Sequence, residues 1–299
     1  MSQNTLELNK KKFHFGRFLL AFLSYLWLIF MVIACLLPVL WMISAAFTQG
    51  RTLDAVPILP DPSRFTTEHF EFIFSYKSNT GPGLPDYQAA FVRTLILAVI
   101  NTVGVIVVAV ISGYVFSRLR FKGKKPLLLG MMVLQMFPSF MGMLALFFIF
   151  DSFGWLDSPN LIALIYIAGS IPYNTFLIRG FMQSIPRSLD EAAEIDGATK
   201  MQTLRKILLP LIVPIIGFIA INAFMTPWMD YMLQSVFLQD KTQTVSMWLF
   251  RTTDPFNTLY YNPLRFMAGA LLISIPIMAI QFYMQRFMVH GLTAGADKG

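Results

Sequence analysis

The residues that could carry out chemistry in this 299-residue chain are few and far apart. His14, His69 and His290 have no spacing that suits a metal site, and Cys35 is the only cysteine. The sequence has no G-x-x-x-x-G-K-[ST] loop for a nucleotide, no G-x-S-x-G nucleophile and no paired carboxylates. We therefore expect neither an enzyme nor a bound cofactor. Any energy for uphill transport must come from another chain or from an ion gradient.

Amides are the main polar side chains inside the long apolar stretches of the sequence. Gln135, Asn174 and Asn222 lie in three such stretches, none of which has an acid or a base near its middle. Intramembrane charges are typical of proton and ion relays, whereas amides suit an uncharged, hydroxyl-rich solute. The three amides are candidates for a translocation path. Hydrogen bonding between neighbouring helices is the alternative role for each of them.

A third polar group follows the fourth apolar stretch. Ser188 with Glu191 three residues later fits a capping box. Asp190, Glu191 and Glu194 fall in the first turns, where the helix dipole favours negative charge, and Gly197 is a natural end for the helix. The pattern predicts a short capped helix on the membrane surface. An ordinary connector between two spans is the alternative.

These residues need a membrane to position them. The chain is 56% hydrophobic and only 13% charged, whereas soluble proteins average about 25% charged residues. This composition excludes intrinsic disorder, and one cysteine excludes a disulfide-built domain. Six stretches are long enough to cross a bilayer as helices, so we expect an all-α membrane protein with six transmembrane helices. The six stretches cover about residues 18–47, 89–116, 127–150, 161–181, 207–233 and 266–289.

Prolines interrupt most of these stretches. A proline inside a helix removes one backbone hydrogen bond, and in lipid the freed carbonyl needs a neighbouring helix or a water-filled cavity. Broken helices are therefore typical of transport paths, although proline is also common in other membrane helices. Five of the six stretches carry an interior proline, at Pro38, Pro138, Pro172, Pro214 and Pro276.

Lysines and arginines flank the stretches asymmetrically and predict the orientation of the chain. They gather before the first stretch, after the second and fourth, and at the C-terminus, so both termini are expected in the cytoplasm. The net charge of +7 thus reflects membrane topology and implies no nucleic-acid partner. The expected organisation is a cytoplasmic tail at 1–17, one six-span domain at 18–289 with external loops at about 48–88 and 234–265 and a cytoplasmic loop at about 182–206, and a cytoplasmic tail at 290–299.

Aromatic residues gather in the second external loop. They suit either contact with an extracellular partner or an interfacial aromatic belt, and the residues alone leave both interpretations open. The five are Trp248, Phe250, Phe256, Tyr260 and Tyr261.

The cytoplasmic loop also carries one motif with fixed spacing. Along the chain it reads Glu191-Ala192-Ala193, three residues, Gly197, nine residues, Ile207, one residue, Leu209-Pro210. This resembles the EAA motif of ATP-binding-cassette importer permeases. Other segments resemble the carbohydrate branch of that family and its MalG-type members from maltose and maltodextrin importers. These segments are Gln135-Met136-Phe137-Pro138, Ala192–Thr199 with Asp196, Leu208–Pro214, and the C-terminal Gly291-Leu292-Thr293-Ala294-Gly295.

The resemblance implies a set of partners in a bacterial cytoplasmic membrane. A MalF-type permease would form a heterodimer with this chain, two ATPase subunits would bind the ATP, and an extracellular solute-binding protein would deliver the sugar. The helix at Glu191–Gly197 would be the coupling helix that docks on the ATPase, with Glu191 meeting a basic residue there. The segment Gly291–Gly295 would reach toward the ATPase dimer interface. Residues 234–265 would correspond to the loop that probes the sugar cleft of the binding protein.

The implied function is import of an oligosaccharide by alternating access, driven by ATP hydrolysis on the partner subunits. Maltose or maltodextrin is the expected solute, and a galacto-oligosaccharide is the alternative. A stand-alone secondary carrier or channel is a hypothesis from another class, and a membrane-embedded enzyme or assembly scaffold is a third. The EAA spacing and the absence of intramembrane charge speak against the carrier.

Overall fold

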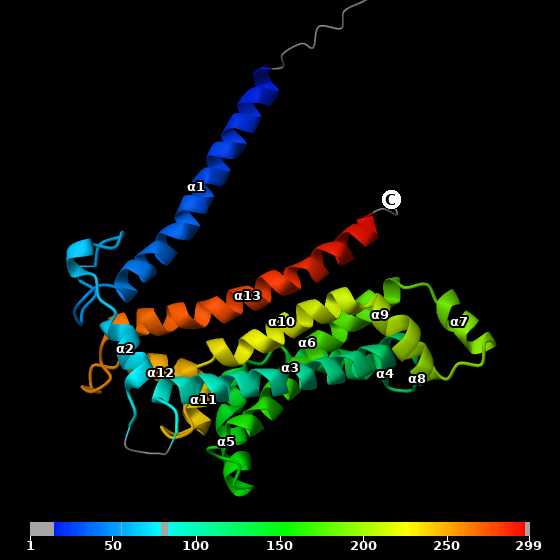
Figure 1. The fold of residues 1–299 in the computed structure, drawn as a ribbon. Helices are drawn as coiled ribbons and strands as arrows, with labels where there is room; N and C mark the ends of the chain where they lie inside the picture. The colour runs from blue at the N-terminus through cyan, green and yellow to red at the C-terminus, as the bar shows by residue number, and fades with distance from the viewer. Residues whose placement is uncertain (1–14, 55, 79–82, 297–299) are drawn as a thin grey trace, which may run out of the picture.

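The computed structural model of the protein describes residues 15–54, 56–78 and 83–296, and its regular elements there are helices. The elements carry the labels of Figure 1. In chain order they are α1 (Phe15–Ala46), η1 (Pro62–Arg64), α2 (Glu68–Ser75), α3 (Asp86–Arg118), α4 (Lys124–Leu134), η2 (Ser139–Gly142), α5 (Met143–Ser152), α6 (Pro159–Ser184), α7 (Ser188–Ile195), α8 (Lys200–Thr203), η3 (Leu204–Leu208), α9 (Leu209–Leu211), α10 (Val213–Met229), α11 (Met232–Phe237), α12 (Val245–Arg251) and α13 (Pro263–Ala296).

Four helices in the described part of the chain are long and apolar enough to cross a bilayer. They are α1, α3, α6 and α13, and they confirm as single helices four of the six predicted stretches. Prolines 38, 172 and 276 lie inside three of them without ending the helix. A fifth span results if the bent pair Lys200–Leu211 and Val213–Met229 is counted as one.

The predicted span at 127–150 is not one helix. It is divided into α4 and α5, with the non-helical segment from Gln135 to Pro138 and the 3₁₀ turn η2 between them. Pro138 precedes η2 with an extended backbone, so it lies outside any helix and not inside one as predicted. Proline cannot donate a backbone hydrogen bond, and it disfavours helical geometry in the residue before it.

The predicted span at 207–233 is bent sharply at Ile212. The two parts meet at an angle of 79°. Pro210 and Pro214 stand on the two sides of the bend, each in the first turn of its helix, where a missing N–H costs nothing. Pro214 was expected inside a span, but it begins α10 instead. The two prolines therefore fix the place where the chain changes direction.

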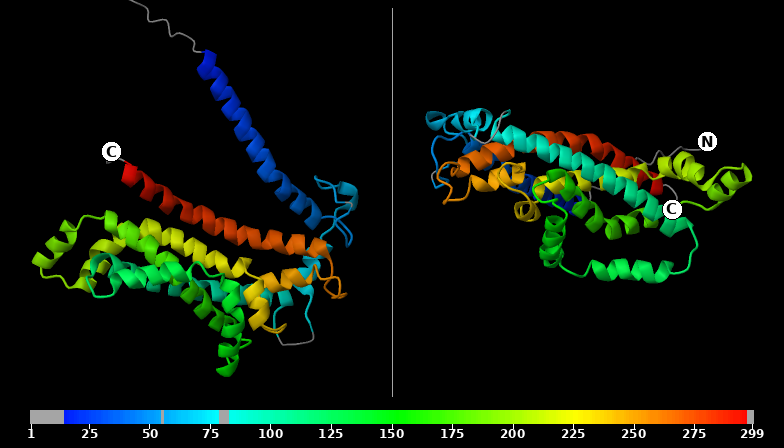
Figure 2. Two further views of the ribbon diagram at one scale, coloured as in Figure 1. Left: turned by 180° about the vertical axis from the view of Figure 1, so that it is seen from behind. Right: turned by 90° about the horizontal axis from the view of Figure 1, so that it is seen from below.

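The helices α3, α6, α10 and α13 lie side by side as an elongated bundle (Figures 1 and 2). The close packing of α3 on α6 depends on Gly113, where an added Cβ would lie 2.3 Å from Cγ2 of Ile178. The helix α1 meets α13 near its own C-terminal end and otherwise stands away from the bundle. No residue in the most apolar 18-residue stretch of α1 is buried.

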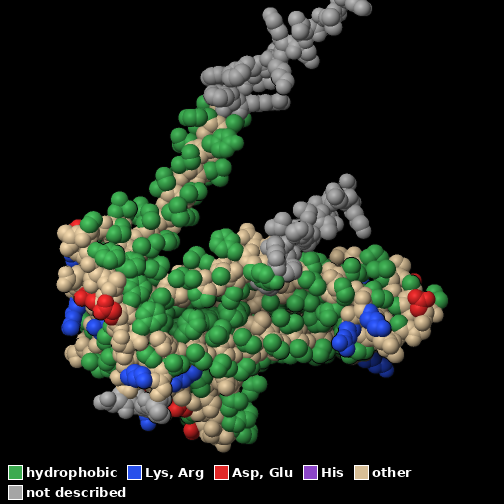
Figure 3. Space-filling view, in the orientation of Figure 1, with side chains coloured by type: hydrophobic (Ala, Val, Ile, Leu, Met, Phe, Trp, Pro, Cys, Tyr) green, Lys and Arg blue, Asp and Glu red, His purple; other side chains and the backbone are tan. Residues whose placement is uncertain are grey.

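The two ends of the bundle differ from its apolar sides. Hydrophobic side chains cover the visible flank, and charged side chains gather at the two ends (Figure 3). We call the end with α7, α8 and the C-terminal residues of α3 the α7 end, and the end with α2, α11 and α12 the α2 end. An apolar flank with charged ends is what a bilayer requires of a helical protein.

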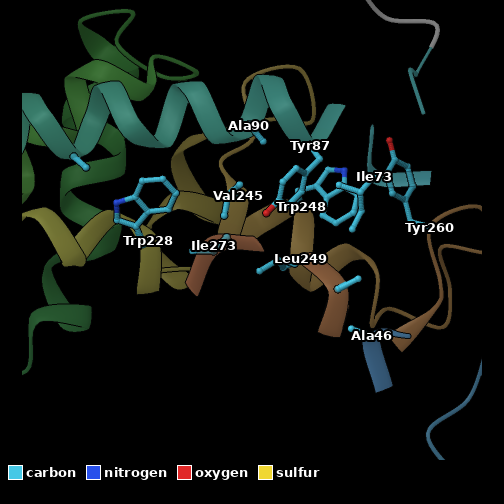
Figure 4. Packing of buried hydrophobic residues seen from close by; sticks show 12 residues of the cluster. Ala46, Ile73, Tyr87, Ala90, Trp228, Val245, Trp248, Leu249, Tyr260 and Ile273 are labelled. Carbon is cyan, nitrogen blue, oxygen red and sulfur yellow. The ribbon is translucent and has the colours of Figure 1, made fainter. Parts of the chain in front are cut away.

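Each end has its own buried cluster. At the α2 end, Trp248 of α12 packs edge-on against Tyr87 of α3 with ring centroids 4.9 Å apart, and the Tyr87 hydroxyl donates to the carbonyl of Gly269 (Figure 4). At the α7 end, the buried side chains of Met182 and Leu208 belong to a second cluster that joins α6 to η3. The segment that contains α7 and α8 is attached to the bundle through this second cluster.

Candidate functional site

The helix α7 forms where the sequence predicts a surface helix. It starts two residues after Pro186, and its first turn contains Asp190 and Glu191. The chain leaves the helix through Gly197, whose φ of +76° lies in the left-handed region that favours glycine. The amide of Ala198 donates to the carbonyl of Ala193 at 2.9 Å, which closes the last turn. The predicted helix and its end are confirmed.

The predicted capping box at Ser188 is wrong. Arg187 already has helical dihedral angles and is the N-cap of α7, so the Ser188 hydroxyl comes one residue too late to cap. A capping box does occur further along the loop, at the start of α8. There the Thr199 hydroxyl accepts from the amide of Gln202 at 3.3 Å, and the Gln202 side chain accepts from the amide of Thr199 at 2.8 Å.

The EAA motif divides into an exposed part and a buried part. Glu191, Ala192, Asp196 and Gly197 are exposed on α7 or just beyond it, whereas Ala193 is only 3% exposed. Among these motif residues, only the small side chain of Ala193 packs against the bundle, and the acids Glu191 and Asp196 face outward.

The second half of the motif anchors the loop to the bundle. Ile207 and Leu209 are half-buried, and Leu209 packs against the cluster that contains Met182 and Leu208. Pro210 is exposed at the bend. The motif thus runs continuously from the exposed helix α7 to the 79° bend in the chain.

An ion pair that the sequence analysis missed ties α7 to the end of α3. The Nε atom of Arg118 lies 3.1 Å from Oδ2 of Asp190, and the Arg118 side chain is only 7% exposed. Nη2 of Arg118 also donates to the carbonyl of Ile185 at 3.1 Å. The available signal was an arginine at the end of a span and an acid in the first turn of the surface helix. In the sequence, this arginine is one of the basic residues after the second stretch, which predict only the orientation of the chain.

A small polar cleft of about 160 Å³ lies between α3, α7 and α8. Acids and bases both line it, so its charges largely compensate one another. Its walls are Tyr114, Arg118, Leu119, Arg187, Asp190, Glu191, Glu194, Lys200 and Thr203.

The α2 end is built from the two predicted external loops. His69 of α2 is buried, and its Nε2 donates to the carbonyl of Thr48 at 2.9 Å. Burial lowers the pKa of His69, and the Thr48 carbonyl offsets this only in part. An open cleft of about 670 Å³ lies beside it, lined by Gln49, Gly50, Arg51, Glu68, His69, Glu71, Phe72, Ser75, Tyr76, Asn262 and Arg265.

The aromatic residues of the second external loop do not act as a group. Trp248 and Tyr260 are buried, and the Tyr260 hydroxyl donates to Oδ2 of Asp86 at 2.6 Å. Burial is the main cause that raises the pKa of Tyr260 above its usual value. Phe256 is 94% exposed and Phe250 is 47% exposed. Two of the five therefore build the core, which neither interpretation anticipated, and at least two are available for contacts.

The three candidate path amides lie on three different elements. Gln135 is exposed at the end of α4, Asn174 is buried in α6, and Asn222 is exposed on α10. The side chain of Asn222 donates to the carbonyl of Phe218 in its own helix at 2.8 Å. None of the three lines the clefts at the two ends of the molecule. Their role in a path stays a prediction.

Both chain ends fall partly outside the described residues. The segment Gly291–Gly295 continues the helix α13, but its side chains are not described, so its predicted contact with an ATPase stays a prediction. The tail at 1–14 also lies outside the described residues. In the described part of the chain, no group of three His, Cys, Asp or Glu side chains could hold a metal ion.

Comparison with known proteins bears on the whole chain. Residues 105–293 match the family described as "Binding-protein-dependent transport system inner membrane component". The galactooligosaccharides transport system permease protein GanQ of Bacillus subtilis is 36% identical over 284 residues, which cover 95% of this chain and 97% of GanQ. The maltodextrin permease MdxG of the same organism is 33% identical, covering 92% and 95%. MalG of Escherichia coli K12 is 29% identical, covering 93% and 96%.

The fold is also similar to that of a solved transporter. A chain of a bacterial ABC transporter involved in the import of the acidic polysaccharide alginate superimposes with a TM-score of 0.71, covering 91% of this chain and 97% of the other at 20% identity. The expected resemblance to ABC importer permeases of the MalG type is therefore confirmed. Because the family model matches residues 105–293 and GanQ is 36% identical over 95% of this chain, the chain belongs to the family of binding-protein-dependent transport system inner membrane components.

Proposed function

We propose that this chain is a permease subunit of an ABC importer that moves an oligosaccharide by alternating access. A solute-binding protein delivers the sugar outside, and ATP is bound and hydrolysed by two partner ATPase subunits. The matched family and the sugar permeases among its relatives support this function. The observation that carries the mechanism is the short path of the chain from α7, through the turn at Gly197 and then α8, η3 and α9, to the bend before α10.

The connection can transmit a movement of α7 to the membrane domain. The ion pair between Arg118 and Asp190 holds α7 to α3, and the half-buried side chains of Ile207 and Leu209 hold the second part of the motif to the bundle. Exposed Glu191 is free to meet a basic residue of the ATPase. We propose that α7 is the coupling helix and that closure of the ATPase dimer moves it against the bend.

A second permease subunit, of the MalF type, would complete the membrane domain. The helix α1 carries an apolar surface far larger than its contact with α13. A partner permease packed along α1 would cover this surface, and lipid would cover the remainder. The polar ends and broken helices would then line a path between the two subunits.

We further propose six crossings with both termini in the cytoplasm. The pair α4 and α5 would make the third crossing, with its break at Gln135–Pro138 inside the membrane. The bent pair ending in α10 would make the fifth. In the sequence, lysines and arginines outnumber acids in the segments at the α7 end, which supports this orientation, because positive residues stay on the cytoplasmic side.

Two sugars are candidates for the solute. The C-terminal segment Gly291–Gly295 favours maltose or maltodextrin by its resemblance to MalG-type permeases. The 36% identity with a galactooligosaccharide permease favours a galacto-oligosaccharide. The affinity of the copurifying binding protein for each sugar decides between them, because that protein selects what the permease receives.

The coupling role is tested by reconstituting the complete transporter in vesicles. Reversing the charge at Glu191 (Glu191→Lys) should leave the subunits assembled but reduce sugar uptake per ATP hydrolysed at least tenfold. Glu191→Asp keeps the charge and is the matched control. Uptake by the Glu191→Lys transporter at the wild-type rate would contradict docking through α7. Uptake by this chain alone, without ATPase or binding protein, would instead support a stand-alone carrier.

A further inference from the structure

A second, larger cleft adjoins the small polar cleft at the α7 end, shares Arg118, Leu119, Arg187 and Lys200 with it, and has no acid among its own wall residues. It has a volume of about 680 Å³ and lies beside the junction between α3 and α4. Four of its wall residues are basic, the other three are apolar, and no acid lines it. The seven residues are Val115, Arg118, Leu119, Arg120, Phe121, Arg187 and Lys200.

Three of the four cations are available for a ligand. Arg118 is engaged by Asp190. In the part of the chain that the structure describes, no carboxylate lies within ion-pair distance of Arg120, Arg187 or Lys200. Two of these three cations flank the α7 segment. Arg187 is the N-cap of α7, and Lys200 is the first residue of α8.

The surroundings of Lys124 show that the positive charge is concentrated here. Its Nζ donates to the carbonyl of Leu119, a wall residue of the cleft, at 3.0 Å. Burial lowers the pKa of Lys124 first, and the neighbouring cations of Arg179, Arg187 and Arg120 lower it further. A site where cations repel one another gains stability when an anion enters it.

Apolar side chains are also exposed on the two helices that meet at the cleft. Phe121 is 37% exposed, and Ile111 on α3 and Leu127 on α4 are 51% and 53% exposed. The cleft therefore combines cations from α7, α8 and the end of α3 with apolar residues from the end of α3 and the junction to α4. A phosphate on an acyl chain has this same polarity, whereas a soluble anion would use only the cationic side.

We infer that this cleft binds an anionic phospholipid, with the phosphate between Arg120, Arg187 and Lys200 and an acyl chain along Phe121 and Leu127. Arginine forks suit phosphate oxygens, and basic pockets on the cytoplasmic side of membrane helices bind anionic headgroups. The headgroup would tie the start of α7 and the start of α8 to the bilayer. This consequence for coupling, and the placing of the cleft on the cytoplasmic side, rest on the proposed function.

The test uses the full chain, purified with its copurifying subunits and without added ATP or sugar. Short-chain phosphatidylglycerol, phosphatidylcholine of the same chain length and inorganic phosphate are titrated separately, and bound lipid is counted by native mass spectrometry. A salt concentration of about 0.3 M screens cations on the open surface. We expect one tightly held phosphatidylglycerol per chain, and binding of phosphatidylcholine or phosphate at least tenfold weaker.

Two double variants locate the lipid. Each cation near an anionic headgroup contributes about a fivefold factor in binding, so Arg187→Gln with Lys200→Gln should weaken phosphatidylglycerol binding about 25-fold. Lys122→Gln with Lys125→Gln removes two exposed lysines near the junction of α3 and α4 that do not line the cleft, and should change phosphatidylglycerol binding less than threefold.

Four results would each overturn the inference. They are equal binding of phosphatidylcholine, equal binding of inorganic phosphate, an equal loss in the lysine control, and lipid binding that occurs only after the ATPase subunits are stripped away. The last result would assign the cleft to the ATPase contact. Because the measurement involves neither ATP nor sugar, any of these failures leaves the proposed function standing.

Discussion

The ion pair between α3 and α7 makes a prediction about local stability. Replacing Asp190 by asparagine keeps the shape of the side chain but removes its charge. The Arg118 guanidinium then stays in place, 7% exposed, with its hydrogen bond to the Ile185 carbonyl but without a counter-charge. Because α7 rests on the bundle through few other side chains, Asp190→Asn should loosen α7 without unfolding the spans.

The magnitude follows from the burial of the two partners. Breaking a fully buried pair costs about 3–5 kcal/mol, and an exposed pair contributes about 0–1 kcal/mol. Asp190 is 19% exposed and borders the cleft of about 160 Å³, which water can enter. We therefore expect about 2 kcal/mol, which corresponds to about a 30-fold increase in the population with α7 detached.

Hydrogen exchange of the purified transporter measures this population directly. The amides of Asp196 and Ala198, which close the last turn of α7, should exchange about 30-fold faster in Asp190→Asn, whereas those of α3 stay protected. Glu194→Gln removes an exposed acid from the same helix and should change exchange less than threefold. Unchanged exchange in Asp190→Asn, or an equal effect in Glu194→Gln, would refute the anchoring role of Arg118.

Three further predictions concern glycines and the buried histidine. Gly113→Ala should cost about 2–3 kcal/mol of unfolding free energy, because the new Cβ meets Cγ2 and Cβ of Ile178 at 2.3 and 2.5 Å. In Gly104→Ala the new Cβ meets the flexible end of the Ile167 side chain, so the cost should be under about 1 kcal/mol. Denaturant titration of the two variants measures both free energies. Gly197→Ala has open space around it but keeps φ at +76°, so about 1 kcal/mol of strain should speed exchange in α7 about fivefold. The folded-state pKa of His69 is lowered by burial, so protonation favours the unfolded form, and the stability of the α2 end should fall as pH drops below about 6.5. Thermal melts at pH 7.5 and 5.5 should differ for the wild type and not for His69→Gln.

Hydrophobic length predicted the straight spans well and the broken ones poorly. A run of about twenty apolar residues predicts a membrane-spanning segment. This rule correctly predicted the helices α1, α3, α6 and α13. The rule does not determine whether a proline is tolerated. Pro172 and Pro276 stay inside helices while Pro138 separates two, because the outcome depends on neighbours that accept or replace the lost backbone hydrogen bonds.

The part of the candidate site that depends only on local backbone geometry could be predicted from the sequence. Gly197 ends α7 because a left-handed turn favours glycine, and this needs no tertiary information. The ion pair was not predictable, because Arg118 and Asp190 are brought together only by the packing of α3 on α6 and by the turn at Ile185. The predicted N-cap at Ser188 was wrong by one residue, because helical dihedral angles begin at Arg187.

The acids of α7 therefore lie in two different environments, which the sequence alone does not distinguish. Asp190 faces the bundle and neutralises Arg118, whereas Glu191 one residue later faces outward. Successive residues on a helix point about 100° apart, so one acid can hold the helix to α3 while the next reaches a partner. A helix that transmits force needs both contacts, because a partner pulling on an unanchored α7 would move the helix and leave the bend before α10 unchanged. Loss of the inner contact should thus uncouple transport even when docking through Glu191 is intact.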